Sequence, residues 1–173
     1  MIKVQQGRAE KLVTGLASES KRWEENTKVL EEDLKNIIGN IILVAGSISY
    51  LGPFNAKYRA SLLESWIENC KKSGLQVSNN FSLEHIIADP VQVREWNQSG
   101  LPGDKLSIEN AILMANSARW CLIIDPQSQA NRFIKNFERE NKLHNIKLSD
   151  AKFLQILEGG IRTGQPVLLE NID

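Results

Sequence analysis

The chain has 173 residues, which is enough for one ordinary domain or one domain with an appendage, but not for a large multidomain enzyme. Its 21 Lys and Arg residues balance its 21 Asp and Glu residues. No net positive field is therefore available to attract nucleic acid or an anionic membrane surface, and neither is expected as a partner. No apolar run approaches the ~20 residues that span a bilayer, and the N-terminal residues lack the apolar stretch of a secretory signal, so an intracellular globular protein is expected.

The residues that bind metals or form disulfides are few and scattered. The chain holds two cysteines, Cys70 and Cys121, and two histidines, His85 and His144. None of them stands in the spacing of a zinc site, and no disulfide scaffold is indicated. Cys70 falls on the apolar stripe of a predicted helix, so we expect it in the core rather than as a reactive thiol.

Residues 1–38 are expected to form a long polar helix, because charges of both signs alternate there and proline is absent. Apolar residues seven apart, interleaved with a second set, give the alternating four-three spacing of a coiled coil. The first set is Leu16, Trp23, Leu30 and Ile37, and the second is Ser20, Thr27, Leu34 and Ile41. We therefore expect Leu16, Trp23, Leu30, Leu34 and Ile37 to face one particular partner helix. The spacing leaves open an amphipathic helix that lies on its own domain, with Trp23 as a surface aromatic.

A globular domain is expected over residues 39–173, since the sequence becomes markedly apolar after Gly39. Residues 41–50 favour a buried helix with Asn40 as its cap, although Ile41, Ile42 and Val44 also suit a strand. Further helices are expected over 58–72, after Ser82, from Asp89 and Pro90, over 107–116 and 129–140, and over 151–162 with Asp150 as cap. Buried strands are expected over 120–124, 146–148 and 167–169. This alternation predicts an α/β fold with a layered parallel sheet.

The segment from Gly100 to Ser107 invites comparison with the phosphate-binding pattern GxxxxGK[ST]. The spacing does not match, because Gly103 is followed by Asp104 before Lys105 and Ser107. A carboxylate would then lie where the charge of a phosphate must be neutralised. No strand clearly precedes this loop either.

Two predicted strand ends complete the comparison. The apolar run that ends at Asp125 could place a metal ligand, but the following Pro126 lacks the carboxylate that orients an attacking water. Asn171, after the last predicted strand, stands where a γ-phosphate sensor is often found. Together these residues indicate a nucleotide-binding frame whose catalytic residues have been replaced, and no bound cofactor or metal is expected.

Several long motifs resemble the fifth AAA+ module of a dynein heavy chain. They are Trp96…Gly100-Leu-Pro, Ser107-Ile-Glu-Asn, Arg119-Trp-Cys-Leu-Ile-Ile-Asp-Pro-Gln127, and Gly164-Gln-Pro-Val-Leu-Leu-Glu-Asn171. Upstream, Gly15-Leu…Arg22-Trp23 and Gly52-Pro-Phe54…Tyr58-Arg59 resemble the returning helix of the dynein stalk and its junction with that module. One departure is Cys121, where this family commonly has proline.

The resemblance implies a slice of a very large microtubule motor. Residues 1–38 would be the second strand of the stalk coiled coil, and residues 39–173 a partial large subdomain of a degenerate, P-loop NTPase-like AAA+ module. The implied role is to transmit nucleotide-driven conformational change to the microtubule-binding tip without hydrolysing ATP. An alternative left open is a nucleotide-binding module with weak ATP binding or hydrolysis.

The resemblance also implies partners and a location. The partners would be the outgoing stalk helix and neighbouring AAA+ modules of the same heavy chain, the microtubule through the tip domain, and other dynein chains. ATP and Mg²⁺ would belong to other modules. The location would be the cytoplasm and cytoskeleton, in the axoneme of a cilium or flagellum. Arg119, Asp125, Gln127 and Asn131 are expected near the former nucleotide cleft or an inter-module contact, and a plain carboxylate cap by Asp125 remains the alternative.

Overall fold

The computed structural model describes residues 2–172, with side chains described for residues 14–17 and 19–172. The chain divides into two compact units, Met1–Ser82 and Leu83–Asp173. The first unit contains helices α1 (Ile2–Tyr50) and α2 (Ala56–Lys72). In the part of the chain that the structure describes, no helix combines the length and the apolar character that crossing a bilayer requires.

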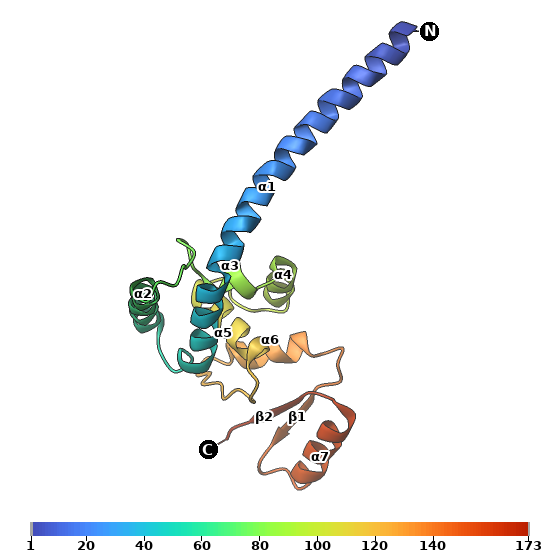
Figure 1. Ribbon diagram of the computed structural model, residues 1–173. Helices are drawn as coiled ribbons and strands as arrows, with labels where there is room; N and C mark the ends of the chain where they lie inside the picture. Colours follow the sequence, from blue (N-terminus) through green and yellow to red (C-terminus); the bar gives the residue numbers. More distant parts are fainter. Residues whose placement is uncertain (1, 173) are drawn as a thin grey trace. The chain divides into compact units, whose positions relative to one another are not determined.

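Helix α1 is a single helix of 49 residues, drawn as one continuous ribbon in Figure 1. The helix predicted over residues 41–50 is confirmed, but the predicted helix start at Asn40 is wrong. Gly39 and Asn40 lie inside α1, and the Asn40 side chain bonds to Ser78 instead of capping the backbone. Because this contact joins residues 38 positions apart, local pattern could not indicate it.

Helix α2 packs against the C-terminal part of α1. It begins at Ala56 with Asn55 as cap, and Asn55 Oδ1 accepts a hydrogen bond from the Tyr58 amide at 3.1 Å. Cys70 lies in the core, as predicted. The core of this unit consists of Leu43, Cys70 and Val77, surrounded by Leu63, Trp66, Ile67, Leu75 and Phe81.

Over its described residues, 83–172, the second unit contains five helices and two strands. The helices are α3 (Leu83–Ile87), α4 (Pro90–Gln98), α5 (Lys105–Asn116), α6 (Gln129–Phe137) and α7 (Phe153–Thr163), and the strands are β1 (His144–Lys147) and β2 (Val167–Glu170). The strands pair in parallel, with Ile146 opposite Leu169. Helix α7 is the crossover between them, and it approaches β2 so closely that a Cβ at Gly160 would lie 2.5 Å from Val167 Cγ2. Trp96, Ile112 and Phe133 are the largest buried apolar side chains of this unit.

Two helix starts differ from the sequence-based expectation. Helix α5 begins at Lys105 rather than Ser107, because the Asp104 carboxylate caps it. Asp150 is not the side-chain cap of α7: its Oδ2 accepts the Lys147 amide at 2.7 Å, and α7 begins at Phe153. A carboxylate one turn before a helix can satisfy either the helix amides or the preceding strand end, and sequence does not distinguish these two outcomes.

The predicted buried strand over residues 120–124 is wrong. Residues 117–125 form no strand, and Trp120, Leu122 and Ile124 are between 76% and 94% exposed. The sheet in the described residues has two strands only, so this segment lacks a neighbouring strand against which to bury its side chains. The observed fold is therefore mostly helical with a small parallel sheet. The predicted layered α/β sheet, with a third strand at residues 120–124, is not observed.

Candidate functional site

The predicted partner face of α1 is exposed along its described length. Leu16, Trp23, Leu30, Leu34 and Ile37 are each between 45% and 68% exposed. Surface ion pairs lie beside this face, between Arg22 and Glu19 at 2.6 Å and between Lys28 and Glu24 at 2.8 Å. An apolar stripe edged with charges is typical of a helix that pairs with another helix.

We call the face formed by the two sets of heptad positions the seam of α1, and its Thr27 needs no partner across an interface. Thr27 Oγ1 donates a hydrogen bond to the carbonyl of Trp23 at 2.8 Å, within α1 itself. A hydroxyl satisfied by its own helix can be buried against a partner without requiring a matching acceptor. Thr27 therefore does not fix the axial position of whatever helix packs here.

The predicted degenerate loop at Gly103–Ser107 is the start of a helix. Asp104 accepts hydrogen bonds from the Ser107 hydroxyl at 2.7 Å and from the Ser107 amide at 3.0 Å, and these bonds lower the pKa of the Asp104 carboxyl. Lys105 Nζ lies 3.8 Å from Glu109 Oε1, one turn further along α5. A Cβ at Gly103 would meet nothing within 4 Å, so no close backbone approach requires glycine there.

A second loop, Asp125–Ser128, leads directly into α6. The Asp125 carboxylate accepts the backbone amides of Gln129 and Asn131, each at 2.9 Å. Ser128 adopts the left-handed conformation with φ of 56° and makes no side-chain cap. The carboxylate cap that the sequence left as an alternative is therefore confirmed. Asp125 occupies the amides at the helix N-terminus, where a bound anion would otherwise interact.

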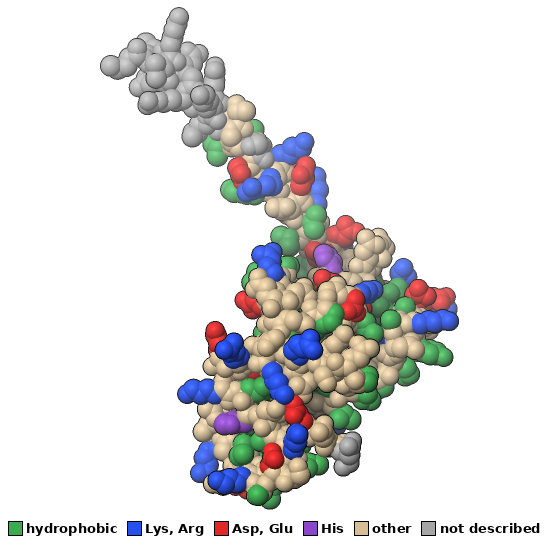
Figure 2. Space-filling view, turned by 180° about the vertical axis from the view of Figure 1, so that it is seen from behind, with side chains coloured by type: hydrophobic (Ala, Val, Ile, Leu, Met, Phe, Trp, Pro, Cys, Tyr) green, Lys and Arg blue, Asp and Glu red, His purple; other side chains and the backbone are tan. Residues whose placement is uncertain are grey.

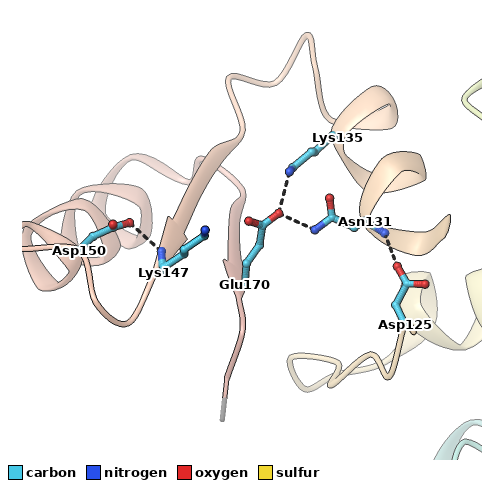
Figure 3. A network of polar contacts seen from close by, with 6 residues as sticks. All are labelled: Asp125, Asn131, Lys135, Lys147, Asp150 and Glu170. Carbon is cyan, nitrogen blue, oxygen red and sulfur yellow. Dashed lines mark hydrogen bonds and ion pairs between the residues drawn. The ribbon is translucent and has the colours of Figure 1, made fainter. Parts of the chain in front are cut away.

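Glu170 at the end of β2 joins this loop through α6, as Figure 3 shows. Its Oε1 accepts hydrogen bonds from Asn131 Nδ2 at 2.5 Å and from Lys135 Nζ at 2.6 Å. The Lys135 ammonium and the Asn131 amide lower the pKa of Glu170 to about 2. The carboxylate therefore stays charged at neutral pH, and it ties α6 to the C-terminal end of a parallel strand.

This second loop invites the same comparison with a phosphate-binding loop. The pattern GxxxxGK[ST] stands between a strand and a helix, whereas residues 120–137 run from an apolar segment that forms no strand, through the loop, into α6. Read from Asp125, its four fixed positions hold Asp125, Ala130, Asn131 and Arg132. Sequence reasoning missed this placement because no glycine or lysine marks it, although the apolar run before Asp125 could have indicated it.

The remaining predicted residues are Arg119, Gln127 and Asn171. Asn171 directly follows Glu170 and has a positive φ of 54°. Gln127 accepts a hydrogen bond from the Gln129 side chain at 3.2 Å, and the Arg119 amide bonds to Ser117 Oγ at 3.3 Å. Over the residues that the structure describes, no group of three or more His, Cys, Asp or Glu side chains is placed to hold a metal ion.

Charges are interspersed on the surface. On the face shown in Figure 2, basic and acidic side chains alternate over both the helix and the globular part. This distribution agrees with the equal numbers of basic and acidic residues in the sequence. The face shown in Figure 2 has no single-sign area of the kind that attracts a polyanion.

Two family models match the chain in sequence. The microtubule-binding stalk of dynein motor matches residues 2–69, and the ATP-binding dynein motor region matches residues 94–173. The chain is 48% identical over 165 residues to dynein axonemal heavy chain 6 of Homo sapiens, and this match covers 95% of the chain. It is 45% identical over 166 residues to dynein axonemal heavy chain 1 of Mus musculus, covering 96% of the chain.

The chain spans about 4% of the length of these curated relatives. The two matched family models follow one another along it in the order stalk, then motor region. The exposed coiled-coil face of α1 lies within the first matched range, and the Asp125 loop lies within the second. The chain therefore belongs to the dynein heavy chains, as a segment that runs from the stalk into the motor region.

Proposed function

We propose that this chain is the mechanical link between the returning stalk helix and the fifth AAA+ module of an axonemal dynein heavy chain. In this role α1 pairs with the outgoing stalk helix and carries conformational change toward the microtubule-binding tip, while the Asp125 loop takes no part in ATP hydrolysis. The exposed face from Leu16 to Ile37 supports the first statement. The occupied amides of α6 support the second.

The second unit would be part of a degenerate layered AAA+ sheet. The parallel pair β1 and β2, joined by the crossover helix α7, is the kind of unit from which such sheets are built.

The single observation that carries the non-catalytic role is the position of the Asp125 carboxylate. A phosphate bound at a helix N-terminus interacts with free backbone amides and with the positive end of the helix dipole. Here the amides of Gln129 and Asn131 already bond to Asp125. A triphosphate would have to displace this carboxylate and would be repelled by its charge, so the loop does not fit ATP.

The residues that would act on the phosphates are also replaced or engaged. Asn131 stands where the pattern has its lysine, and it carries no charge to neutralise a phosphate. Glu170 is held by Lys135 and Asn131.

The proposed location and partners follow from the relatives. Those that the chain matches are named as axonemal heavy chains, and we extend that location to this chain. Its partners would be the outgoing stalk helix, the adjoining AAA+ modules, the microtubule through the tip, and other dynein chains. ATP and Mg²⁺ would act in other modules of the same motor.

Isothermal titration calorimetry of the 173-residue chain with ATP or ADP and Mg²⁺ tests the non-catalytic role. We expect no binding tighter than about 1 mM, which corresponds to roughly −4 kcal/mol. Micromolar binding that is lost in Lys135→Ala but retained in the control Lys105→Ala would assign nucleotide binding to the Asp125 loop. That result would overturn the proposed role in favour of a nucleotide-binding module.

A further inference from the structure

Helix α6 makes polar contacts with two other elements of the second unit. On one side, Asn131 and Lys135 bond to Glu170 at the end of β2, and both side chains point from α6 toward that carboxylate in Figure 3. On another side, Asn136 Nδ2 donates a hydrogen bond to the carbonyl oxygen of Ser99 at 3.0 Å. Ser99 is the C-cap residue of α4, so α6 joins the end of a strand to the end of another helix.

These contacts leave α6 in different directions. At 3.6 residues per turn, Asn136 lies about 120° around the helix axis from the midpoint of Asn131 and Lys135. The buried Phe133 lies about 180° from that midpoint. Helix α6 is therefore held on three sides, by the core, by the end of β2 and by the end of α4.

The backbone at the end of α4 presents the Ser99 carbonyl to α6. The Leu101 amide donates to the Trp96 carbonyl at 3.0 Å, which is the bond of a Schellman motif. Gly100 between them adopts a φ of 102°, a conformation that favours glycine. The motif bonds the Trp96 carbonyl, and Asn136 bonds the Ser99 carbonyl. Gly100, which the sequence suggested as part of a phosphate-binding pattern, thus shapes a turn that α6 contacts.

A movement of α6 that breaks one of its two polar contacts also disturbs the other. Lys135 and Asn136 are consecutive residues, and each residue advances only about 1.5 Å along a helix axis. A shift or rotation that takes Lys135 away from Glu170 therefore displaces Asn136 from Ser99. Helix α6 has nine residues, and helices of this length are marginal in water on their own. Its order therefore depends on these tertiary contacts.

The turn after α4 depends on the same helix. Residues 100–104 join α4 to α5 and include Gly100 and Gly103. Glycine loses more conformational freedom on ordering than any other residue, and the hydrogen bond from Asn136 to Ser99 opposes that loss. A Cβ at Gly100 would lie 3.7 Å from Asn136 Nδ2, so this side chain lies directly against the turn.

We propose that α6 and the turn at residues 99–101 form one cooperative unit, closed at β2 by Glu170 and at α4 by Asn136, which opens and closes as a whole. A disturbance at the end of β2 then reaches the end of α4 through α6. The inference concerns contacts within the second unit. It depends neither on the pairing of α1 nor on the absence of nucleotide binding, so it can fail while the proposed function holds.

Amide hydrogen exchange measured by NMR on the 173-residue chain tests this coupling. Glu170→Ala removes the acceptor of a charged hydrogen bond and should raise exchange of the Leu101 amide about tenfold. Asn136→Ala removes a neutral hydrogen bond and should raise exchange of the Asn131 amide about fivefold. Glu170→Gln keeps an acceptor for Asn131, so its effect at Leu101 should be smaller than that of Glu170→Ala. Each substitution thus acts on an amide beyond the contact that it removes.

Glu158→Ala and Asn141→Ala are the matched controls, because both positions are exposed in the same unit. Asn141 bonds to the nearby Glu138 at 2.8 Å and not to β2 or α4. Both controls should leave the two reporter amides unchanged. The Ile156 amide of α7, which donates to the Lys152 carbonyl, reports on opening of the whole unit and should keep its exchange rate in every variant.

Two results would overturn the proposal. If Glu170→Ala changed exchange at Asn131 alone and Asn136→Ala changed it at Leu101 alone, the two contacts would be independent. If exchange at Ile156 rose by the same factor as at Leu101 and Asn131, the second unit would open as a whole, and α6 with its turn would not be a separate cooperative unit.

Discussion

Asn131 and Glu170 lie 39 positions apart in the sequence, yet the Asn131 side-chain amide donates to Glu170 Oε1 at 2.5 Å. With the bond from Lys135 at 2.6 Å, this contact fastens α6 to the end of β2. In open α/β sheets, ligands bind in the crevice outside the carboxyl ends of the strands. At the carboxyl end of β2, side chains of the chain itself join the strand to α6.

Glu170→Gln should lower the free energy of unfolding by about 1 kcal/mol, because the neutral amide keeps an acceptor for Asn131 but loses the charge paired with Lys135. The value is at the low end for a charged hydrogen bond, since the Lys135 side chain is 38% exposed. Urea unfolding followed by circular dichroism measures it. Glu140→Gln, at an exposed position of the same unit, is the control and should change stability by less than about 0.5 kcal/mol.

The contribution of Glu170 to stability should depend on pH in the acid range. Its pKa is lowered from 4.5 to about 2 in the folded chain, so the folded state favours the charged carboxylate. The stabilisation is fully present above pH 4.5 and is lost as the pH falls toward 2. Unfolding curves of the native chain and Glu170→Gln, taken between these limits, should converge as the pH decreases. A stability difference that stays constant over this range would contradict the assigned ion pair.

Asp125→Ala should weaken the start of α6 by about 1 kcal/mol, the usual cost of removing a helix cap. The amides of Gln129 and Asn131 would lose their acceptor, so their hydrogen exchange should become faster. Asp150→Ala is the matched control, because that carboxylate accepts the Lys147 amide rather than an amide of α6. Equal exchange rates at Gln129 in the native chain and in Asp125→Ala would refute the cap.

Local periodicity predicted most of the helices but could not predict the tertiary contacts that other segments make with them. The coiled-coil spacing of α1 follows a 3.5-residue repeat, the apolar stripe of α2 follows a 3.6-residue repeat, and both helices are observed. Gly39 and Asn40 look like a helix boundary, since glycine and asparagine usually mark one. Their actual role depends on Gln76 and Ser78, whose approach is a tertiary contact without a local signal.

The sequence also could not predict the local structure of the candidate site. The glycine, lysine and serine residues near position 103 led to the comparison with a phosphate-binding loop, although in the structure they lie at the start of α5. The Asp125 loop has neither glycine nor lysine, and the comparison there follows only from the order of apolar run, loop and helix. Its own residues could not predict whether the 120–124 segment is buried or exposed, because burial of a strand requires neighbouring strands.

Trp23→Ala tests the proposed pairing of α1. The Trp23 side chain is 64% exposed, so its removal should leave the unfolding midpoint of the 173-residue chain unchanged. In the intact motor the same change should weaken helix pairing by about 2 kcal/mol, the burial of one large apolar side chain, and reduce microtubule-stimulated ATPase activity. Glu25→Ala, on the opposite face of α1, is the control and should leave the stimulation intact. Equal stimulation in Trp23→Ala and Glu25→Ala would show that the seam does not carry the conformational change, since both chains would be folded and only one would lack a seam residue.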